Sequence, residues 1–510
     1  MPVSRSKNAI LNIVVGWGTQ VAILVLAFVS RRIFVKFLST DYLGINGLYS
    51  NILSVLALAE LGLGHITQYF LYKPILENDY KKINATVKYF GRLYAFIALG
   101  VFAIGLALIP FLRFIINSDL KQNELIIYYL IFLVNSCVTY FAADKIALLA
   151  ANQDNRLTKY ITLTLNIGLQ FAHVAILYIW HNYIIYLLAT LTSTILNVVI
   201  TQIICHRRYP YLKGKAANSE VIDKKNIVNS IKSTFVYKIG VNVINNTDNI
   251  LISIIVSTAM VGLYSNYLVV ISAIQGFLSI ITTSLISAIG SLSAEGSTKR
   301  SHEIFNLMIL FYHFVSAFCG VSFFFLLNDF IPIWLGEEYL LDQWTVFAIS
   351  FSFYLINAIS PIWMFREANG LFSKVKYLLL ITAAFNIVFS IILGKFFGIF
   401  GILIATSLAR IVTTVWYEPK ILFENVFEES CITYWLKQAK YIVLTVIGAA
   451  VCFAVNYFLP HSFIFTIVKG ISFFAIFVMV FSIFCMKDQE FKEVKKIISR
   501  FTKKIKHGGG

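Results

Sequence analysis

The sequence predicts an all-α membrane protein of about fourteen transmembrane helices, arranged as two related six-helix halves around a central cavity, with two further helices at the C-terminus. Hydrophobic residues make up 58% of its 510 positions, charged residues make up 13%, and the mean hydropathy is +0.78. A soluble domain could not bury that much apolar surface. A helix needs about 20 apolar residues to cross the hydrocarbon core, and runs of this kind recur along the whole chain.

The expected spans follow one another with short connections, and no loop is long enough to fold as a catalytic domain. The connections near 180–183 and 397–399 are so short that the adjoining spans must form tight hairpins. The expected spans are 9–38, 43–71, 89–116, 124–148, 157–180, 183–205, 231–256, 265–290, 303–328, 343–365, 375–397, 399–421, 437–459 and 462–486.

Short matches in the same order indicate that the chain contains two copies of one module. The peptide Gly-Leu-Tyr-Ser-Asn occurs at 47–51 and again at 262–266. Three more pairs follow at similar offsets: Ile109-Pro110 with Ile331-Pro332, Ala151-Asn152 with Ala368-Asn369, and Asn166-Ile167 with Asn386-Ile387. Duplicated halves inside a membrane are typical of a transporter whose site lies between them.

The distribution of lysine and arginine predicts the orientation of the chain. These residues concentrate in the loops after even-numbered spans and in the C-terminal tail, whereas the loop at 329–342 is acidic. Because short cytoplasmic loops carry the positive charge, both termini are expected in the cytoplasm. Six spans per half is an even number, so the repeat is parallel rather than inverted.

The predicted organisation has five parts. They are an N-lobe of spans 1–6 at 1–205, a cytoplasmic inter-lobe loop at 206–230, a C-lobe of spans 7–12 at 231–421, spans 13 and 14 at 422–486, and a basic cytoplasmic tail at 487–510. The tail is either an amphipathic helix on anionic lipid or a solvated stop-transfer segment. Gly508–Gly510 resembles the remnant of a tag and is left out of the fold.

Several classes of function are excluded by the sequence. The net charge of +17 is scattered over short loops, which does not fit a nucleic-acid-binding face. The six cysteines show neither a disulfide framework nor a zinc motif. Nucleotide-binding glycine loops and the common hydrolase motifs are missing from the sequence, so neither an enzyme nor transport driven by ATP in this chain is expected.

Arg31, Arg32 and Lys36 form the first group of charged residues at membrane depth. They lie in the outer half of span 1, where the positive-inside rule does not place them. Two guanidinium groups in a cavity are suited to a phosphate or diphosphate. The alternative is that these side chains extend to the outer lipid surface.

Asp248 in span 7 is the second candidate. By the repeat offset it corresponds to the Arg31-Arg32 region, so one half carries cations where the other carries an acid. Asp248 could bind a proton or sodium ion, or pair structurally with a cation such as Lys238.

Glu60 in span 2 and Arg410 in span 12 complete the set of charged cavity candidates, because both lie well inside their spans. His65 and His173 are expected to make interhelical hydrogen bonds rather than to carry protons. Asn135 and Asn386 could serve as interhelical contacts. Aromatic residues make up 15% of the chain, and a tyrosine-rich cavity would suit an oligosaccharide.

Several stretches together resemble the polysaccharide transporter family, the oligosaccharide flippases of the multidrug/oligosaccharidyl-lipid/polysaccharide (MOP) superfamily. The resemblance covers nearly the whole chain, including the number of spans. The stretches are Arg31-Arg32, Tyr42–Gly44, Gly47–Tyr49, Glu60–Gly64, Asp248–Ile252, Gly262–Tyr264, Phe330–Gly336 and Ala368–Lys374.

This resemblance implies a flippase for polyprenyl-diphosphate-linked oligosaccharide repeat units. The substrate would be made on the cytoplasmic face of a bacterial inner membrane and turned over for assembly into capsule, O-antigen, teichuronic acid or exopolysaccharide. The two lobes would rock in alternating access, with spans 13 and 14 beside them. Membrane lipids and glycan polymerase machinery are the implied partners, and a monomer is expected because the fold would be self-contained.

The resemblance also assigns roles to particular residues. An arginine of span 1, here Arg31 or Arg32, would contact the diphosphate. A sodium site known in some relatives would fall on Asp248, Asn386 and Thr406. Its fourth position falls on Ser390, which has no charge, so proton coupling and an uncoupled mechanism stay open.

Two rival functions fit parts of the sequence. A multidrug extruder of the same superfamily would share the fold, but it would need acids in the cavity rather than Arg31 and Arg32. A membrane-bound polymerase or ligase of the same glycan pathway would need a larger exterior loop than 329–342.

Overall fold

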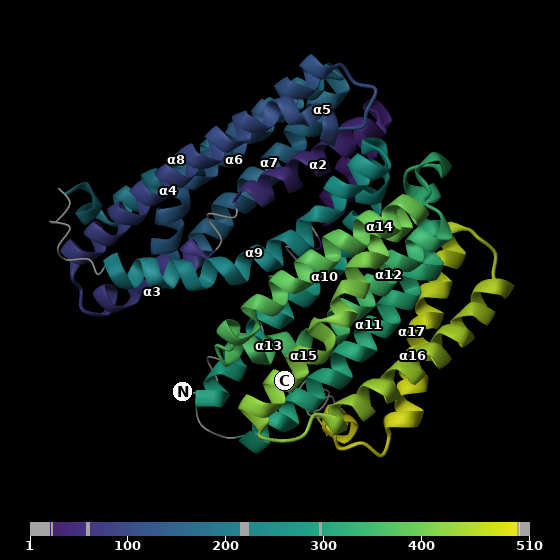
Figure 1. Cartoon of the computed structure of the whole chain (residues 1–510). Helices are drawn as coiled ribbons and strands as arrows, with labels where there is room; N and C mark the ends of the chain where they lie inside the picture. The colour runs from purple at the N-terminus through teal and green to yellow at the C-terminus, as the bar shows by residue number, and fades with distance from the viewer. Residues whose placement is uncertain are drawn as a thin grey trace, which may run out of the picture. The chain divides into compact units, whose positions relative to one another are not determined.

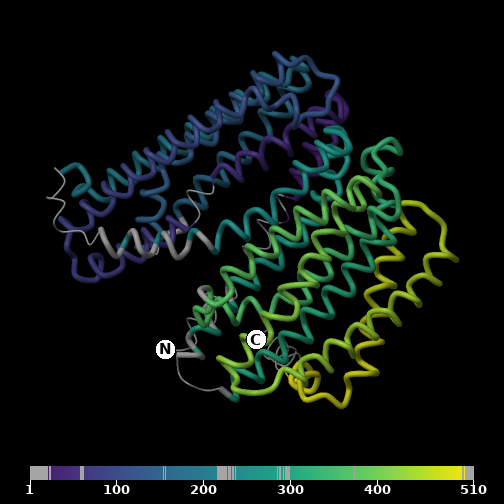
Figure 2. The backbone as a smooth tube through the Cα atoms, in the orientation of Figure 1, coloured from purple at the N-terminus to yellow at the C-terminus, as the bar shows by residue number. Residues whose placement is uncertain are grey.

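In the computed structural model, every regular element in the described part of the chain is a helix, which confirms the all-α membrane fold. The described residues are 21, 24–57, 62–152, 154–214, 224–294, 298–496 and 499 (Figure 2). Glu60, the sequence-predicted cavity residue of span 2, lies outside them.

The chain forms two compact units, and each is described by itself. The first unit runs up to Ser265 and includes Leu379–Ala383, whereas the second contains Asn266–Leu378 and the chain from Ala384 onward. Helix α9 packs against α2 within the first unit. The predicted boundary between the two lobes, at 206–230, follows from the sequence repeat. The compact units divide the chain at a different place, after Ser265, so this boundary stays a prediction.

In the first unit, α6 is the helix around which its neighbours gather. It contacts α2, α3, α4, α7 and α8, and Figure 1 shows α4, α6 and α8 running side by side. A helix whose described part covers 24–37 precedes these elements. The bounds are α2 Thr40–Leu56, α3 Leu63–Leu76, α4 Tyr80–Leu108, η2 Ile109–Phe111, α5 Leu112–Ile115, α6 Gln122–Ala151, α7 Asn155–Ile179, α8 Tyr183–Arg208, η3 Pro210–Lys213 and α9 Lys224–Ile255.

In the second unit, α11 holds the corresponding central place and contacts α12, α13, α16 and α17 (Figure 1). The helix α10 begins in the first unit and continues in the second. The bounds are α10 Thr258–Ala294, α11 Thr298–Trp334, η5 Glu337–Tyr339, α12 Gln343–Ala358, α13 Ser360–Ala368, α14 Phe372–Val412, α15 Thr414–Leu422, a π-helical turn Phe423–Phe427, α16 Ile432–Phe458 and α17 Phe463–Cys485.

Both predicted hairpins are confirmed. Between α7 and α8, His181 has a φ of 49°, and the Asn182 side chain accepts hydrogen bonds from the backbone N–H groups of Ile184 and Ile185. This is the N-cap that a helix beginning directly after a turn requires. The stretch Phe372–Val412 is likewise two helices, because Gly398 breaks it with a φ of 59° and a ψ of −139°.

Ten helical stretches among the described residues are long and apolar enough to cross a membrane. One of them, Lys374–Phe427, contains both spans of the hairpin at Gly398. The predicted spans 1, 2 and 7 are not among the ten. Spans 1 and 2 include residues outside the described part, and α9, which is span 7, carries polar residues such as Asn246 and Asp248.

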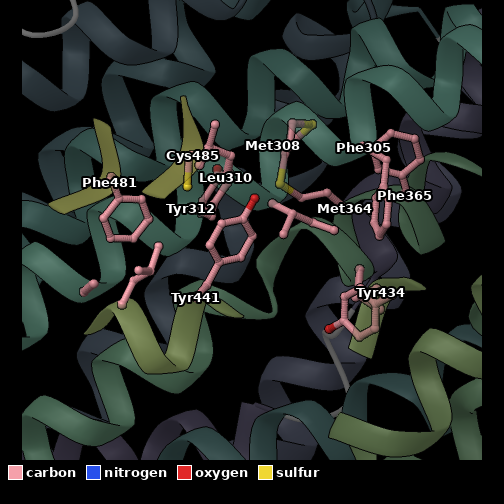
Figure 3. Packing of buried hydrophobic residues seen from close by; sticks show 14 of the residues in the cluster. Phe305, Met308, Leu310, Tyr312, Met364, Phe365, Tyr434, Tyr441, Phe481 and Cys485 are labelled. Atoms are coloured by element: carbon pink, nitrogen blue, oxygen red, sulfur yellow. The ribbon is translucent and has the colours of Figure 1, made fainter. Parts of the chain in front are cut away.

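Aromatic and sulfur-containing side chains build the core of the second unit. Figure 3 shows Phe305 and Phe365 on one side of this cluster and Tyr441 and Phe481 on the other. Phe305 and Phe365 meet edge to face at 5.2 Å, an arrangement that aromatic rings favour. These contacts join α11, α13, α16 and α17 by packing.

The first unit contains a crossing of two helix starts that are related by the repeat. A Cβ on Gly44 of α2 would overlap the carbonyl oxygen of Thr258, and a Cβ on Gly262 of α10 would overlap that of Thr40. Both helices thus place a threonine and, four residues later, a glycine at the crossing. Small residues at this spacing let helix backbones approach closely in membranes.

Hydrogen bonds hold the start of α10 at this crossing. The backbone N–H of Thr258 donates to the carbonyl of Asn117 at 2.9 Å, and the Thr258 hydroxyl accepts from the N–H of Asn117 at 3.0 Å. The Ser253 hydroxyl donates to the carbonyl of Ile115 at 2.8 Å. The residues that follow α5 therefore position the crossing.

Two buried ion pairs stabilise the second unit, and neither was predicted. Arg366 of α13 donates to Glu418 of α15 at 2.6 Å, and the two residues are only 4% and 7% exposed. Lys469 of α17 is fully buried and donates to Asp329 of α11 at 2.8 Å. Asp329 also bonds His461 at 2.6 Å.

Replacing Gly44 with alanine is expected to lower the free energy of unfolding by about 1–3 kcal/mol, because the added methyl group forces the crossing apart. Gly100 on α4 is a matched control, since a Cβ there meets nothing within 4 Å. Gly100→Ala should be neutral or stabilise by up to about 1 kcal/mol. Reversible unfolding in mixed detergent micelles measures the free energy of unfolding of the two variants. Equal changes in Gly44→Ala and Gly100→Ala would refute the close crossing.

Glu418→Gln is expected to lower the free energy of unfolding by about 3 kcal/mol, because it removes the carboxylate nearest to the buried Arg366 and leaves the longer pair with Glu367 at 3.8 Å. Glu424→Gln serves as the control, since Glu424 forms an exposed pair with Lys420 at 3.9 Å. The control should change stability by less than about 1 kcal/mol. The free energy of unfolding is measured in the same way. If Glu418→Gln lowers it no more than Glu424→Gln does, the buried ion pair is contradicted.

Candidate functional site

A cavity of about 480 Å³ lies within the first unit, between α2, α6, α7 and α8. Its volume falls in the range of about 300–1,000 Å³ that is usual for small-molecule sites. The lining residues are Asn46, Ser50, Leu53, Ser54, Ala57, Ile131, Phe132, Asn135, Ser136, Thr139, Tyr140, His173, Tyr186, Leu187 and Thr190. We call this the first-unit pocket.

Among the described residues that line the first-unit pocket, none is an aspartate, glutamate, lysine or arginine. Their polar groups are amides, hydroxyls and one imidazole. Much of the polar surface comes from residues four apart on one helix, such as Asn46, Ser50 and Ser54 on α2. That spacing places side chains on one face of a helix.

One wall of the pocket is an aromatic stack between α7 and α8. The rings of His173 and Tyr186 lie 3.6 Å apart at an interplanar angle of 18°. His173 Nε2 and the Thr190 hydroxyl are 3.0 Å apart, which confirms the interhelical hydrogen bond predicted for this histidine. The stack and the bond fix the imidazole on the pocket wall.

Two acceptor-type atoms of the pocket residues have no hydrogen-bond partner. They are Oδ1 of Asn135 and Nδ1 of His173. His173 is only 5% exposed, so its ring is deeply buried. Because buried polar atoms are normally hydrogen-bonded, each unpaired atom calls for an explanation.

The structure separates the cations that the sequence grouped together. Arg31 is partly buried and donates to the Ser265 hydroxyl at 3.1 Å, and it lies close enough to Tyr186 of the pocket wall for its charge to act on that phenol. Arg32 and Lys36 are exposed, and Lys36 Nζ lies 5.6 Å from the ring centroid of Phe37. Arg31 is therefore the cation beside the first-unit pocket.

Asp248 also lies in the first unit, on α9. It interacts electrostatically with Tyr264, the tyrosine of the second Gly-Leu-Tyr-Ser-Asn peptide. One turn and a half earlier on α9, Asn242 donates to the carbonyl of Ser54, a pocket residue, at 2.6 Å. The helix that carries Asp248 thus touches the helix that lines the pocket.

The remaining candidates lie in the second unit. Asn386 Nδ2 donates to the Thr406 hydroxyl at 2.8 Å across the hairpin at Gly398, and Ser390 bonds the carbonyl of Ile402 at 3.5 Å. A sodium ion binds oxygen atoms, whereas this bond uses an N–H of Asn386 and one lone pair of the Thr406 hydroxyl, so it does not test the predicted ion site. The sodium site stays a prediction from the sequence.

Arg410 is at the end of α14 and interacts electrostatically with Glu418, the partner of Arg366. It therefore belongs to a buried charge cluster, which no sequence pattern had indicated. Among the described residues, no group of three or more histidine, cysteine, aspartate or glutamate side chains could hold a metal ion.

Sequence reasoning missed most of the pocket residues, although a signal for them exists. Polar residues recur four apart within otherwise apolar spans, as Asn46, Ser50 and Ser54 on α2 and as Asn135 and Thr139 on α6. A polar stripe of this kind indicates a face turned toward protein or water rather than lipid.

Comparison with known proteins places this fold. No protein-family model matches the chain, and no curated protein matches it in sequence. Among solved structures, the lipid II flippase MurJ in an inward closed conformation matches with a TM-score of 0.66 at 15% identity, covering 93% of this chain and 100% of that one.

Two other solved structures are also similar. A MOP superfamily transporter from Pyrococcus furiosus, described as having a binding pocket of reversed polarity, matches with a TM-score of 0.57 at 14% identity over 83% of this chain and 97% of its own. An inward-facing multidrug resistance MATE family transporter matches with a TM-score of 0.55 at 16% identity over 79% and 97%. These neighbours are transporters and flippases rather than enzymes, and the chain has the fold of MOP superfamily transporters.

Proposed function

We propose that the chain is a flippase that moves polyprenyl-diphosphate-linked oligosaccharide repeat units across the bilayer by alternating access. One observation carries this proposal: a partly buried arginine, Arg31, lies beside a pocket that the described residues line with amides, hydroxyls and aromatic rings. A substrate with an anionic head and a neutral, hydroxyl-rich body matches both features. The similarity to a lipid II flippase over 93% of the chain supports it.

Arg31 is the residue we propose for the diphosphate. A guanidinium group presents a planar fork of donors that matches phosphoryl oxygens. Its present partner is the neutral hydroxyl of Ser265, which an anionic oxygen can replace with a stronger, charge-assisted bond. Arg32 and Lys36 are exposed and, in this proposal, contact lipid head groups instead.

The proposed setting is a bacterial inner membrane with both termini in the cytoplasm, as the loop charges predict. The substrate is picked up on the cytoplasmic side and released on the outer side, while its polyprenyl tail stays in the bilayer. The chain acts as a monomer, with membrane lipids around it and glycan polymerase machinery as the consumer of its product.

Asp248 is the residue we propose for coupling to an ion gradient. A carboxylate within a membrane span is costly unless it is paired or functional, and Asp248 shares α9 with amide residues. Protonation would neutralise this carboxylate and change its interaction with Tyr264. No step of the proposed mechanism requires a sodium ion.

The alternative is a multidrug extruder, which the likeness to MATE transporters also fits. A cationic drug is best held by an acid, and none of the described residues that line the first-unit pocket is one. Asp248 is an acid on which such a function would depend. The flippase is favoured because the charge that adjoins the pocket is the positive charge of Arg31.

Arg31→Ala is expected to reduce translocation of a fluorescent polyprenyl-diphosphate-linked disaccharide in reconstituted vesicles about tenfold or more, because a charge-assisted bond to the diphosphate is lost. Arg31→Lys should restore part of the rate, since it keeps the charge but loses the planar fork. Arg32→Ala is the matched control, with an expected effect below about threefold because Arg32 is exposed.

Equal losses in the Arg31 and Arg32 variants, at matched folding and reconstitution, would overturn the assignment of Arg31. If wild-type vesicles move no glycolipid but export a cationic dye such as ethidium, the extruder is correct and the flippase proposal fails.

Asp248→Asn is expected to abolish the dependence of translocation on a proton gradient while leaving downhill exchange of the lipid within about threefold of wild type. The amide keeps the size of the side chain and its capacity for hydrogen bonds, but it cannot bind and release a proton. The measurement compares rates with and without an imposed pH difference across the vesicle membrane. Retention of the wild-type gradient dependence would remove Asp248 from the coupling step.

A further inference from the structure

The chain folds back onto the second unit directly after α17. A turn at 486–488 follows Cys485, and a helix whose described part covers 489–496 comes next. Phe491 and Val494 of this helix pack against the buried cluster of the second unit that Figure 3 shows. We call this helix the tail helix. It is attached to the core by apolar contacts and is not a free extension of α17.

Two acidic side chains at the start of the tail helix are paired with lysines of α16. Lys440 donates to Asp488 at 2.6 Å, and Lys437 donates to Glu490. The side chains of Asp488 and Glu490 are only 27% and 13% exposed. These two carboxylates are therefore turned toward the protein, and their charge is compensated there.

Lysines occupy the opposite side of the tail helix. Lys492, Lys495 and Lys496 are exposed, and their spacing of three and four places them on one helical face. The exposed Lys487 precedes them in the turn, and Glu493 is the exposed acid of the same segment. We call Lys487, Lys492, Lys495 and Lys496 the lysine face. With the other two acids bonded to α16, this surface is strongly positive.

Neighbouring side chains indicate that the lysine face lies at the level of a bilayer surface. At the end of α17, Ile483 and Met486 are apolar and exposed, and the charged Lys487 follows directly. In the first turn of α16, the ring centroid of Trp435 lies 4.4 Å from that of Trp416, which is 57% exposed. Tryptophan gathers at the interface between hydrocarbon and water. The change from apolar to charged surface thus coincides with the start of the tail.

We propose that the lysine face binds the head groups of anionic phospholipids in the leaflet where α17 ends. In the proposed orientation this is the cytoplasmic leaflet, whose anionic lipids attract basic segments next to a membrane span. The packing of Phe491 and Val494 fixes the lysines as an array, and the bonds to α16 turn Asp488 and Glu490 away from the lipid. For this part of the tail, the proposal favours a lipid-bound helix over a solvated segment.

The test measures which lipids lie beside the tail helix in the full chain, reconstituted in phosphatidylcholine nanodiscs. A neutral bimane fluorophore is attached at Gln489→Cys, an exposed position on the same helical face as Lys492 and Lys496. Cys431→Ser removes a partly exposed native cysteine, and the other five are buried. Phosphatidylglycerol or phosphatidylcholine with a nitroxide high on the acyl chain quenches the fluorophore. The ratio of the two quenching efficiencies measures the preference for an anionic head group.

In the labelled protein, we expect phosphatidylglycerol to be preferred about tenfold or more at low salt, with the preference falling as salt rises. Lys492→Gln/Lys495→Gln should lower the preference about fivefold or more, because two charges leave the surface. Lys492→Arg/Lys495→Arg keeps both charges and should keep the preference. Lys121→Gln/Lys395→Gln is the matched control, since it removes two exposed lysines outside the tail helix and should leave the preference unchanged.

Three results would overturn the proposal. A ratio near one at low salt would leave the lysine face to water or to an acidic partner protein. A preference that high salt or the glutamine pair does not lower would not depend on these lysines. An equal loss in the Lys121/Lys395 control would assign the preference to the total charge of the protein. Size-exclusion chromatography and thermal unfolding verify that each variant is folded.

This inference is independent of the flippase function, because no transport step enters the measurement. A protein that moves no glycolipid can still prefer anionic lipid at the tail helix, and a working flippase can lack that preference. The failure of one proposal therefore leaves the other standing.

Discussion

The close crossing of α2 and α10 at Gly44 and Gly262 is the constraint on which the first unit depends. With no space for a Cβ on either side, the start of α10 is held against α2, and Ser265 comes within 3.1 Å of Arg31. A wider crossing would remove that partner from the partly buried guanidinium, and a charge at membrane depth that lacks a partner is costly. The site is thus positioned by two glycines rather than by strong bonds. The repeated Gly-Leu-Tyr-Ser-Asn peptide contains the second of these glycines.

Elements that depend on local chemistry could be predicted from the sequence. The hairpins at Asn182 and Gly398 follow from a capping side chain and from a backbone conformation with positive φ, both of which are properties of a few neighbouring residues. The ion pairs of Arg366 with Glu418 and of Lys469 with Asp329 could not be predicted in this way. Their partners are 52 and 140 positions apart, and only tertiary packing brings them together.

The candidate site, too, depends on tertiary packing that the sequence could not predict. Arg31 and Arg32 are adjacent in sequence and equal in chemistry, so the sequence cannot say which of them faces protein. The helix turns about 100° between the two positions, and the packing of the helix decides that Arg31 is partly buried while Arg32 is exposed. The first-unit pocket depends on four helices at once. A polar spacing of four could have indicated one wall of it, but not the contacts of His173 with Tyr186 and Thr190, which only the packing of α7 against α8 creates.

Separating the charge from the neutral pocket also suits a transporter better than a receptor. A carrier must release its cargo, so each group should contribute modestly and no single contact should hold the substrate permanently. In the proposed function, a charge-assisted bond at Arg31 would contribute about 1.5–3 kcal/mol, and each neutral hydrogen bond from the pocket lining would contribute about 1 kcal/mol. A diphosphate without its sugar, or a sugar without its diphosphate, would then engage only part of the site. Selectivity for the complete lipid-linked unit can arise from this division without tight binding of either part.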